Sequence, residues 1–353
     1  MVLLLCEAGR RLKDLMGQGH ALMKRRENGE CILPTSQPRR CCRPPGFYPH
    51  RSQWRRWVQC EPTAGMDAPC ARSGHALCVV GSTVYVFGGC AKHRDGADGC
   101  LDDLFSFDLA TLQWERIALG EGALRPKARR SASMVALEDG RLLLSGGAGN
   151  DPDNVRPDMW VFCPRRRQWS VLLSGSAAAP FRQCGQSVCA DGRGRLLFFG
   201  GSTGLSYNND LVEYCLRTNR SQRLATSGCG KPTPRYKHQA FVLGDAMYVI
   251  GGGSFKPPCA GIDVYRLDLA TLEWTAIPTK GIVPPARTAH TCAVDREGRA
   301  VYMYGGFSAD LQCLDTLCRL DLDDMMWSIV APAAAVSGGG SSGNGQVGEP
   351  GAT

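Results

Sequence analysis

Five short runs of apolar residues recur along the chain, and each run ends in a pair of glycines. The runs are VYVFGG, LLLSGG, LLFFGG, MYVIGGG and VYMYGG, and the first glycine of each pair is residue 88, 146, 200, 251 or 305. Short apolar runs rich in β-branched and aromatic residues are typical of buried strands rather than helices. Successive glycine pairs are 58, 54, 51 and 54 residues apart, so the chain repeats one β-rich unit.

A repeat of about fifty residues with a glycine doublet after a strand matches the kelch blade. In that architecture, four-stranded sheets stack radially around a channel as a β-propeller. Glycine suits the end of the run because a residue without Cβ accepts a positive φ and lets neighbouring backbone approach closely. The pattern therefore predicts an all-β fold, a kelch β-propeller with five recognisable blades.

Two other positions recur in the repeats. An arginine lies 16 to 18 residues before it in every repeat, at Arg72, Arg129, Arg182, Arg235 and Arg287. Four repeats carry a tryptophan on the expected outer strand, and the third repeat has a serine there: Trp114, Trp169, Ser221, Trp274 and Trp327. A tryptophan in the wedge between blades buries roughly 150–250 Å². We therefore predict weaker packing in the third blade.

The chain ends suggest three regions. Trp57 precedes Arg72 by 15 residues, which is also the separation of Trp114 from Arg129, so RRWVQC is interpreted as the outer strand of a sixth blade. Either the ring closes on five blades, or the rest of a sixth blade has been lost. We expect a propeller over residues 50–331, a basic N-terminal arm over 1–49 that is partly helical or disordered, and a disordered Gly/Ser-rich tail over 332–353.

The charge distribution and the cysteine spacing indicate which partners and which cell compartment to expect. The net charge is +8, but residues 1–62 hold twelve Lys or Arg against five Asp or Glu, so the rest of the chain is about neutral. This distribution disfavours nucleic acid as a partner, and no apolar run approaches the ~20 residues that span a bilayer. The 18 cysteines include no Cys-x-x-Cys pair. Structural free thiols of this kind predict a reducing compartment, the cytoplasm or the nucleus.

Catalysis is disfavoured because the sequence assembles no recognisable set of catalytic or metal-binding residues. The chain has six histidines, and His75, His238 and His290 occupy one repeat position, which favours a shared structural role over a metal site. We predict no cofactor and no enzymatic activity. A general kelch scaffold for actin or a signalling partner stays open as an alternative function, as does, less favourably, a metal-dependent kelch enzyme.

Several segments resemble one family of kelch proteins. These are ARSGH before VYVFGG, FFGGSTG with the following Tyr207 and Asp210-Leu211, RYKH before MYVIGGG, and Arg287 to His290 before VYMYGG. Over residues 56–331 they are similar to kelch-domain substrate receptors of cullin-2 ubiquitin ligases. The resemblance implies a receptor whose propeller captures C-terminal protein tails that end in glycine, with elongin and cullin-2 as further partners. The family's sixth blade and its helical docking box for elongin and cullin are not recognised after residue 331.

The resemblance also implies where a tail would bind. A peptide carboxylate is held by cationic and hydroxyl donors in a concave site, and the family places such groups just after each repeat arginine and each doublet. Lys237 is our first candidate for the carboxylate, where the family's arginine would offer a bidentate fork. The repeat arginines, Arg235 included, have a structural interpretation of equal standing. The predicted peptide-binding residues are Ser73, Arg130, Ser202, Tyr207, Arg235, Tyr236, Lys237, Ser254, Phe255, Lys256, Thr288 and Phe307, with Cys184 and Thr203 at matching positions.

Overall fold

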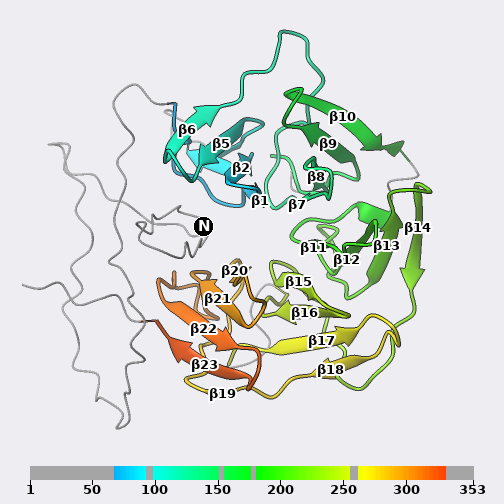
Figure 1. The fold of residues 1–353 in the computed structure, drawn as a ribbon, viewed down its shortest axis with the longest axis vertical. Coiled ribbons are helices and arrows are strands. Elements are labelled where there is room, and N and C mark those ends of the chain that lie inside the picture. Colours follow the sequence, from blue (N-terminus) through cyan, green and yellow to red (C-terminus); the bar gives the residue numbers. More distant parts are fainter. Residues whose placement is uncertain (1–66, 93–97, 151–154, 176–179, 255–260, 331–353) are drawn as a thin grey trace, which may run out of the picture.

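The fold is a β-propeller of five four-stranded blades (Figure 1), seen in a computed structural model that describes residues 67–92, 98–150, 155–175, 180–254 and 261–330. The predicted all-β kelch architecture is therefore confirmed. The expected N-terminal arm, the strand at RRWVQC and the C-terminal tail lie outside the described residues. Among the described residues, no helix has both the length and the apolar character that crossing a membrane requires.

Each blade runs outward from the central axis through four antiparallel strands. Blades 1 and 2 consist of β1 (Ala76–Val80), β2 (Thr83–Phe87), β5 (Leu104–Asp108), β6 (Gln113–Arg116), β7 (Ser133–Ala136), β8 (Leu142–Ser145), β9 (Met159–Cys163) and β10 (Gln168–Leu173). Blades 3 to 5 consist of β11 (Ser187–Ala190), β12 (Arg195–Phe199), β13 (Leu211–Cys215), β14 (Arg220–Leu224), β15 (Gln239–Leu243), β16 (Ala246–Ile250), β17 (Val264–Asp268), β18 (Trp274–Ala276), β20 (Thr291–Val294), β21 (Ala300–Tyr304), β22 (Leu317–Asp321) and β23 (Met326–Ile329). The ribbon of β3 (Cys90–Lys92) and β4 (Asp98–Cys100) extends blade 1, and β19 (Lys280–Gly281) pairs in parallel with β23.

The second strand of each blade is the apolar run seen in the sequence, and it is buried on both faces because blades pack on either side of it. All four residues of β8 are fully buried, for example. The outer strands are more exposed, as in β14, where only Leu224 is half-buried. The core therefore consists of apolar clusters in the wedges between successive blades.

Trp169, Trp274 and Trp327 fill three of these wedges as predicted, whereas Trp114 packs on Phe105 and Phe107 of its own blade. Trp274 is buried against Phe199 of the preceding blade, with ring centroids 5.1 Å apart. Ser221 is exposed, and Phe181, from the segment that enters blade 3, takes over the filling role. The Phe181 ring is fully buried at 4.6 Å from that of Phe198. An aromatic residue from another part of the repeat thus lies in the wedge where the outer strand has Ser221, and weaker packing of the third blade stays a prediction.

The glycine doublets are required by close contact as well as by backbone conformation. At Gly251, with a φ of 59°, a Cβ would lie 2.6 Å from Ile262 Cδ1 and 2.7 Å from His290 Cε1. These distances are far below van der Waals contact, so any side chain at Gly251 would force neighbouring blades apart. The buried histidine of the next blade occupies the space that the missing side chain leaves.

Most repeat arginines hold their own blades together from within. The side chains of Arg129 and Arg235 are fully buried and pair with Asp158 and Asp263. The third repeat differs, because Gln183 rather than Arg182 occupies the equivalent position. The carbonyl of Gln183 accepts a hydrogen bond from Gly147 N–H, as the carbonyl of Arg235 does from Gly201 N–H. Arg182 is exposed, so the predicted alignment was off by one residue in this repeat.

The seam between blades 5 and 1 differs from the other four. At each of the other four seams, the two neighbouring blades share one apolar cluster. The facing sides of blades 5 and 1 carry two separate clusters instead. The first comprises Ala300, Tyr302 and Leu317, and the second comprises Val84, Val86 and Phe107. In the described residues, the five blades are thus not joined across this seam by a shared core.

Candidate functional site

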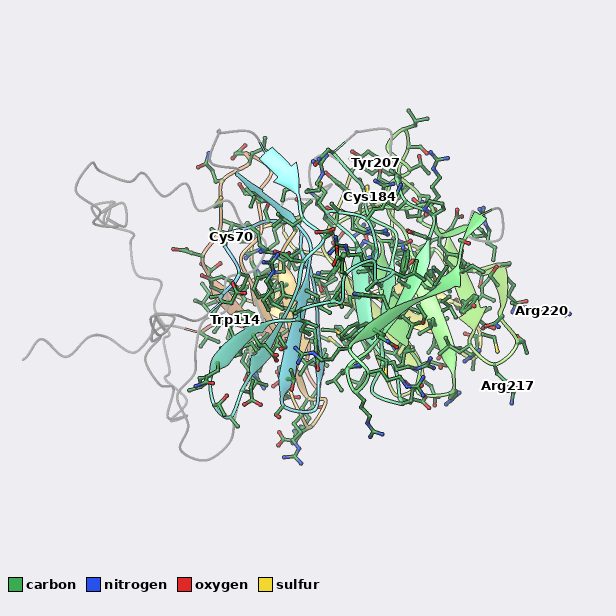
Figure 2. The ribbon with its side chains drawn as sticks, turned by 90° about the horizontal axis from the view of Figure 1, so that it is seen from above. Cys70, Trp114, Cys184, Tyr207, Arg217 and Arg220 are labelled. Atoms are coloured by element: carbon green, nitrogen blue, oxygen red, sulfur yellow. The ribbon has the colours of Figure 1, made fainter. Side chains whose placement is uncertain are left out.

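The two segments predicted to face a ligand meet in every blade and form one face of the propeller. We define this upper face by its five backbone bridges, each between a residue after the repeat arginine position and a residue after the doublet. The bridges join Ser73 to Cys90, Arg130 to Ala148, Cys184 to Ser202, Tyr236 to Gly253, and Thr288 to Phe307. Figure 2 shows Cys184 and Tyr207 on this face, well away from the turn that carries Arg217 and Arg220.

A chain of backbone hydrogen bonds links the blades just below this face. Ser131 N–H donates to Gly74 O at 2.7 Å, Gly185 N–H to Ser131 O, Lys237 N–H to Gly185 O, and Ala289 N–H to Lys237 O. No such bond joins Ala289 to Gly74 within the described residues, which agrees with the divided apolar core at that seam. Lys237 has a φ of 52°, a conformation that only the surrounding bonds can hold in a residue other than glycine. The backbone therefore fixes the direction in which the Lys237 side chain leaves.

Lys237, Tyr236 and Tyr207 form an aromatic and cationic group on the upper face. The Lys237 ammonium lies 5.1 Å from the centroid of the Tyr236 ring, within cation–π range, and the rings of Tyr236 and Tyr207 are 5.0 Å apart. Burial raises the pKa of Tyr236 to about 12, and the neighbouring Tyr207 adds to this effect. The Tyr236 phenol is therefore neutral near pH 7 and can donate a hydrogen bond to an anion.

A second cation, Arg130, lies close enough to Lys237 for its charge to act on the Lys237 ammonium. Burial lowers the pKa of Lys237 below its ordinary value, and the positive charge of Arg130 lowers it further. Neither side chain forms an ion pair with a carboxylate of the described residues. The charges of Lys237 and Arg130 also act on the Cys184 thiol, but burial raises the pKa of this thiol and so disfavours its ionisation. Within the part of the chain that the structure describes, Lys237 and Arg130 thus carry positive charge without a carboxylate partner, which favours an anionic ligand.

Arg156 is a third cation of this region that the sequence did not reveal. Its backbone N–H donates to the doublet residue Gly147, and its guanidinium lies over Gly149, 2.9 Å from where a Cβ would be. Arg156 Nε is buried and has no hydrogen-bond partner, and its charge acts on the Cys100 thiol together with that of Arg130. Arg156 lies in the variable segment after the doublet, where the repeats share no fixed offset, so only the fold could place it.

The other predicted residues divide into three groups. Ser202 and Thr288 are buried in their bridges, whereas Ser73 and Phe307 are half-buried and Ser254 is exposed on the same face. Arg235 is fully buried in its ion pair with Asp263, so its guanidinium belongs to the blade interior rather than to the upper face. Phe255 and Lys256 lie outside the described residues.

Two cysteines of this face lie in direct contact. Cys90 and Cys100 are opposite one another in the β3–β4 ribbon, with their sulfur atoms 3.2 Å apart, and Arg130 Nη1 is 3.9 Å from Cys90 Sγ. All twelve cysteines of the described residues are free. No group of three or more His, Cys, Asp or Glu side chains in the part of the chain that the structure describes is arranged to hold a metal ion.

Comparison with known proteins matches the sequence of this chain to one family model. The model of the KLHDC2/KLHL20/DRC7 Kelch-repeats domain matches residues 47–253 and 244–342. Kelch domain-containing protein 10 of Xenopus tropicalis is 30% identical over 278 residues, covering 75% of this chain and 66% of that protein. The Homo sapiens protein of the same name is 29% identical over 277 residues, covering 74% of this chain and 61% of its own length. The chain therefore spans a little under two thirds of these relatives.

The same type of domain occurs in larger proteins with other names. The flagellar outer arm dynein alpha chain of Chlamydomonas reinhardtii is 29% identical over 290 residues, which cover 76% of this chain and 6% of that protein. A propeller of this kind is thus used as one module among others, so similarity of the blades does not by itself identify a partner.

Proposed function

The chain belongs to the KLHDC2/KLHL20/DRC7 kelch-repeat family, and from this premise we propose that it is a non-catalytic receptor for the C-terminal tails of other proteins. The observation that carries the proposal is the unbalanced positive charge of Lys237 and Arg130 beside Tyr236 and Tyr207 on the upper face. A free carboxylate supplies the missing negative charge. The two phenols supply hydrogen-bond donors and apolar surface for the last residues of a tail.

The geometry favours a small terminal residue. Lys237 is half-buried and its ammonium lies over the Tyr236 ring, so we expect a carboxylate to approach it between side chains rather than across open solvent. A terminal glycine brings its carboxylate to such a place without a side chain that must also be accommodated. This agrees with the glycine-ended tails that the family resemblance implies.

Within this function, we propose that the tail reader serves as the substrate-recognition subunit of a ubiquitin ligase in the cytoplasm or nucleus. The support is the resemblance to ligase receptors, together with the free thiols of the described residues, which fit a reducing compartment. Co-purification of the full chain with recombinant elongin B, elongin C and cullin-2 tests the assembly step. Tail binding without co-purification would leave the reader and remove the ligase role.

The direct test measures fluorescence anisotropy of peptides that end in glycine, with either a free or an amidated C-terminus, against the full chain. We expect amidation to weaken binding about tenfold or more, because a hydrogen bond to a charged group is worth about 1.5–3 kcal/mol. Lys237→Ala should cause a similar loss, and the remaining binding should no longer distinguish free from amidated peptides. Equal binding of both peptides by the unmodified chain would refute tail reading and favour a general scaffold.

Arg217→Ala is the matched control. Arg217 is an exposed cation in the turn between β13 and β14, away from the upper face (Figure 2), and it has no ion pair among the described residues. Its removal lowers the net charge by the same amount as Lys237→Ala. A loss of binding in both variants would show that only the overall charge of the domain attracts the peptide.

A further inference from the structure

Three blades contain the same internal guanidinium site. In blade 4, Arg235 donates to the first doublet carbonyl, Gly251 O, at 2.8 Å and to Asp263 Oδ2 at 3.1 Å. In blade 2, Arg129 makes the equivalent bonds to Gly146 O and Asp158, at 3.0 and 2.9 Å. Blade 1 repeats the pattern with Arg72, Gly88 and Asp103. The doublet carbonyl and the aspartate before the third strand thus form an acceptor pair that binds the planar fork of an arginine.

Blade 3 keeps this acceptor pair and lacks its arginine. Asp210 is the equivalent aspartate, because its carbonyl accepts a bond from Gly200 N–H as the carbonyl of Asp263 does from Gly251 N–H. Gln183 stands at the arginine position, and its Oε1 is buried without a hydrogen-bond partner. No side chain of the described residues donates to Gly200 O. Three acceptor groups therefore meet where the other blades have a repeat arginine, and among the described residues only the exposed Arg223 pairs with one of them, Asp210.

A cavity of about 100 Å³ lies at this place. Its lining includes Gln183, Gly200, Asn208 and Asp210, together with apolar side chains, among them Phe198. The cavity is accessible because the Asp210 side chain is 34% exposed, compared with 16% for Asp263. Arg223 also lines the cavity, and its side chain, which is 71% exposed, forms an ion pair with Asp210 Oδ1 at 3.2 Å. The site thus has an opening to solvent, a carboxylate in its lining and an exposed cation beside that carboxylate.

We propose that this cavity binds the guanidinium group of an arginine side chain contributed by a partner protein. Asp210 and Gly200 O accept from the fork, as their counterparts do from the internal arginines, and Arg223 moves aside. A guanidinium suits the site better than an ammonium because the acceptors are arranged for a planar group with several donors. This site is separate from the tail-binding residues, since none of them lines the cavity.

The test uses capped peptides, Ac-Gly-Arg-Gly-amide and its lysine and citrulline counterparts, followed by amide NMR of the full chain. The citrulline peptide has nearly the shape of the arginine peptide but no charge. We expect the arginine peptide alone to shift the Gly200 backbone and the Gln183 and Asn208 side-chain signals at millimolar concentrations. Equal shifts with citrulline or lysine, or no shifts at all, would overturn the proposal and leave a cavity that holds water only.

Two variants make the assignment specific. Gln183→Arg supplies the missing side chain from within, so it should abolish the peptide shifts while raising the thermal midpoint. Asp210→Asn should abolish them without filling the cavity, whereas Asp245→Asn, at an exposed carboxylate in the turn between β15 and β16, should leave them unchanged. Persistence of the shifts in Gln183→Arg contradicts the site. Agmatine tests whether a small guanidinium compound, rather than a protein side chain, is the ligand. Binding of agmatine as tight as that of the peptide would overturn the proposal that a protein contributes the guanidinium group.

Because the probes are amidated and Lys237 lies outside the cavity, this experiment is independent of tail reading. Lys237→Ala should keep the arginine-dependent shifts at full size. Loss of those shifts in Lys237→Ala would show that the peptide binds on the upper face instead, which overturns the cavity assignment.

Discussion

Blades 3 and 5 depart from the same internal ion pair in opposite directions. Blade 3 has the carboxylate of Asp210 without a buried arginine, and blade 5 has the buried arginine without a carboxylate, because Thr316 stands at the aspartate position. Arg287 keeps its bonds to Gly305 O and Thr316, but its Nη2 is buried without a partner, and burial lowers its pKa. Both blades still form four-stranded sheets, so the pair is not required for the fold.

The two departures differ in their energetic penalty and in whether they leave an accessible binding site. A guanidinium buried without a counter-charge loses hydration that nothing replaces, so blade 5 carries a penalty inside the core. Asp210 is partly exposed and keeps water, so blade 3 avoids that penalty and acquires an open acceptor site. Loss of the buried arginine from a repeat thus creates a candidate binding site, whereas loss of the aspartate leaves only a buried positive charge without a counter-charge.

The largest expected effect comes from imposing the blade 5 arrangement on blade 4. Asp263→Ala leaves the fully buried Arg235 unpaired, and we expect the free energy of unfolding to fall by about 3–5 kcal/mol. Asp210→Ala removes only an exposed ion pair and should cost no more than about 1 kcal/mol. Urea denaturation followed by tryptophan fluorescence measures both. Equal losses would mean that the two aspartates have the same role and that the comparison fails.

The second prediction concerns the aromatic residue that replaces the missing tryptophan of blade 3. Phe181→Ala should cost about 3 kcal/mol, because the ring is fully buried against Phe198 and Tyr214 and its removal leaves a cavity. Ser221→Ala, at the position where other blades have tryptophan, should change stability by less than about 0.5 kcal/mol. A small effect at Phe181 would support the prediction that the third blade is more weakly packed.

The third prediction separates the blades by their response to acid. Burial lowers the pKa of His75, His238 and His290 to about 3, whereas blade 3 has Gln186 at this position. The unfolded chain therefore binds more protons than the folded chain between pH 6.5 and 3, and stability falls as the pH drops through this window. Between pH 7 and 5 each histidine accounts for a loss of about 2 kcal/mol.

Replacing one of these histidines by the residue of blade 3 tests this account. In His238→Gln, urea denaturation at pH 7 and pH 5 should show an acid-induced loss smaller by about 2 kcal/mol than in the unmodified chain. The comparison is made within each variant, so any constant change caused by the substitution cancels. An unchanged pH dependence would show that His238 is not held neutral in the folded state.

The smallest expected effect comes from completing the pair in blade 5. Thr316→Asp places a carboxylate where blades 1, 2 and 4 have one, beside Arg287 Nη1, which lies 3.3 Å from Thr316 Oγ1. We expect a gain of about 1 kcal/mol at pH 7 that disappears when the carboxylate is protonated. Thermal unfolding at pH 7 and pH 3 measures it, and destabilisation at pH 7 would show that Thr316 satisfies Arg287 better than an aspartate can.

The repeated positions of the sequence determined the five blades, their doublets and most of their buried arginines, because each depends on local conformation and on a burial pattern that recurs at nearly the same spacing. The sequence pattern did not identify Gln183, because the adjacent Arg182 also lies at about the expected distance from the doublet. Only the backbone hydrogen bonds distinguish the two residues. The third-blade wedge, the position of Arg156 and the cavity beside Asp210 were decided by the tertiary structure alone. Each arises where segments with variable spacing meet across blades, and such proximity has no period that a single sequence can display.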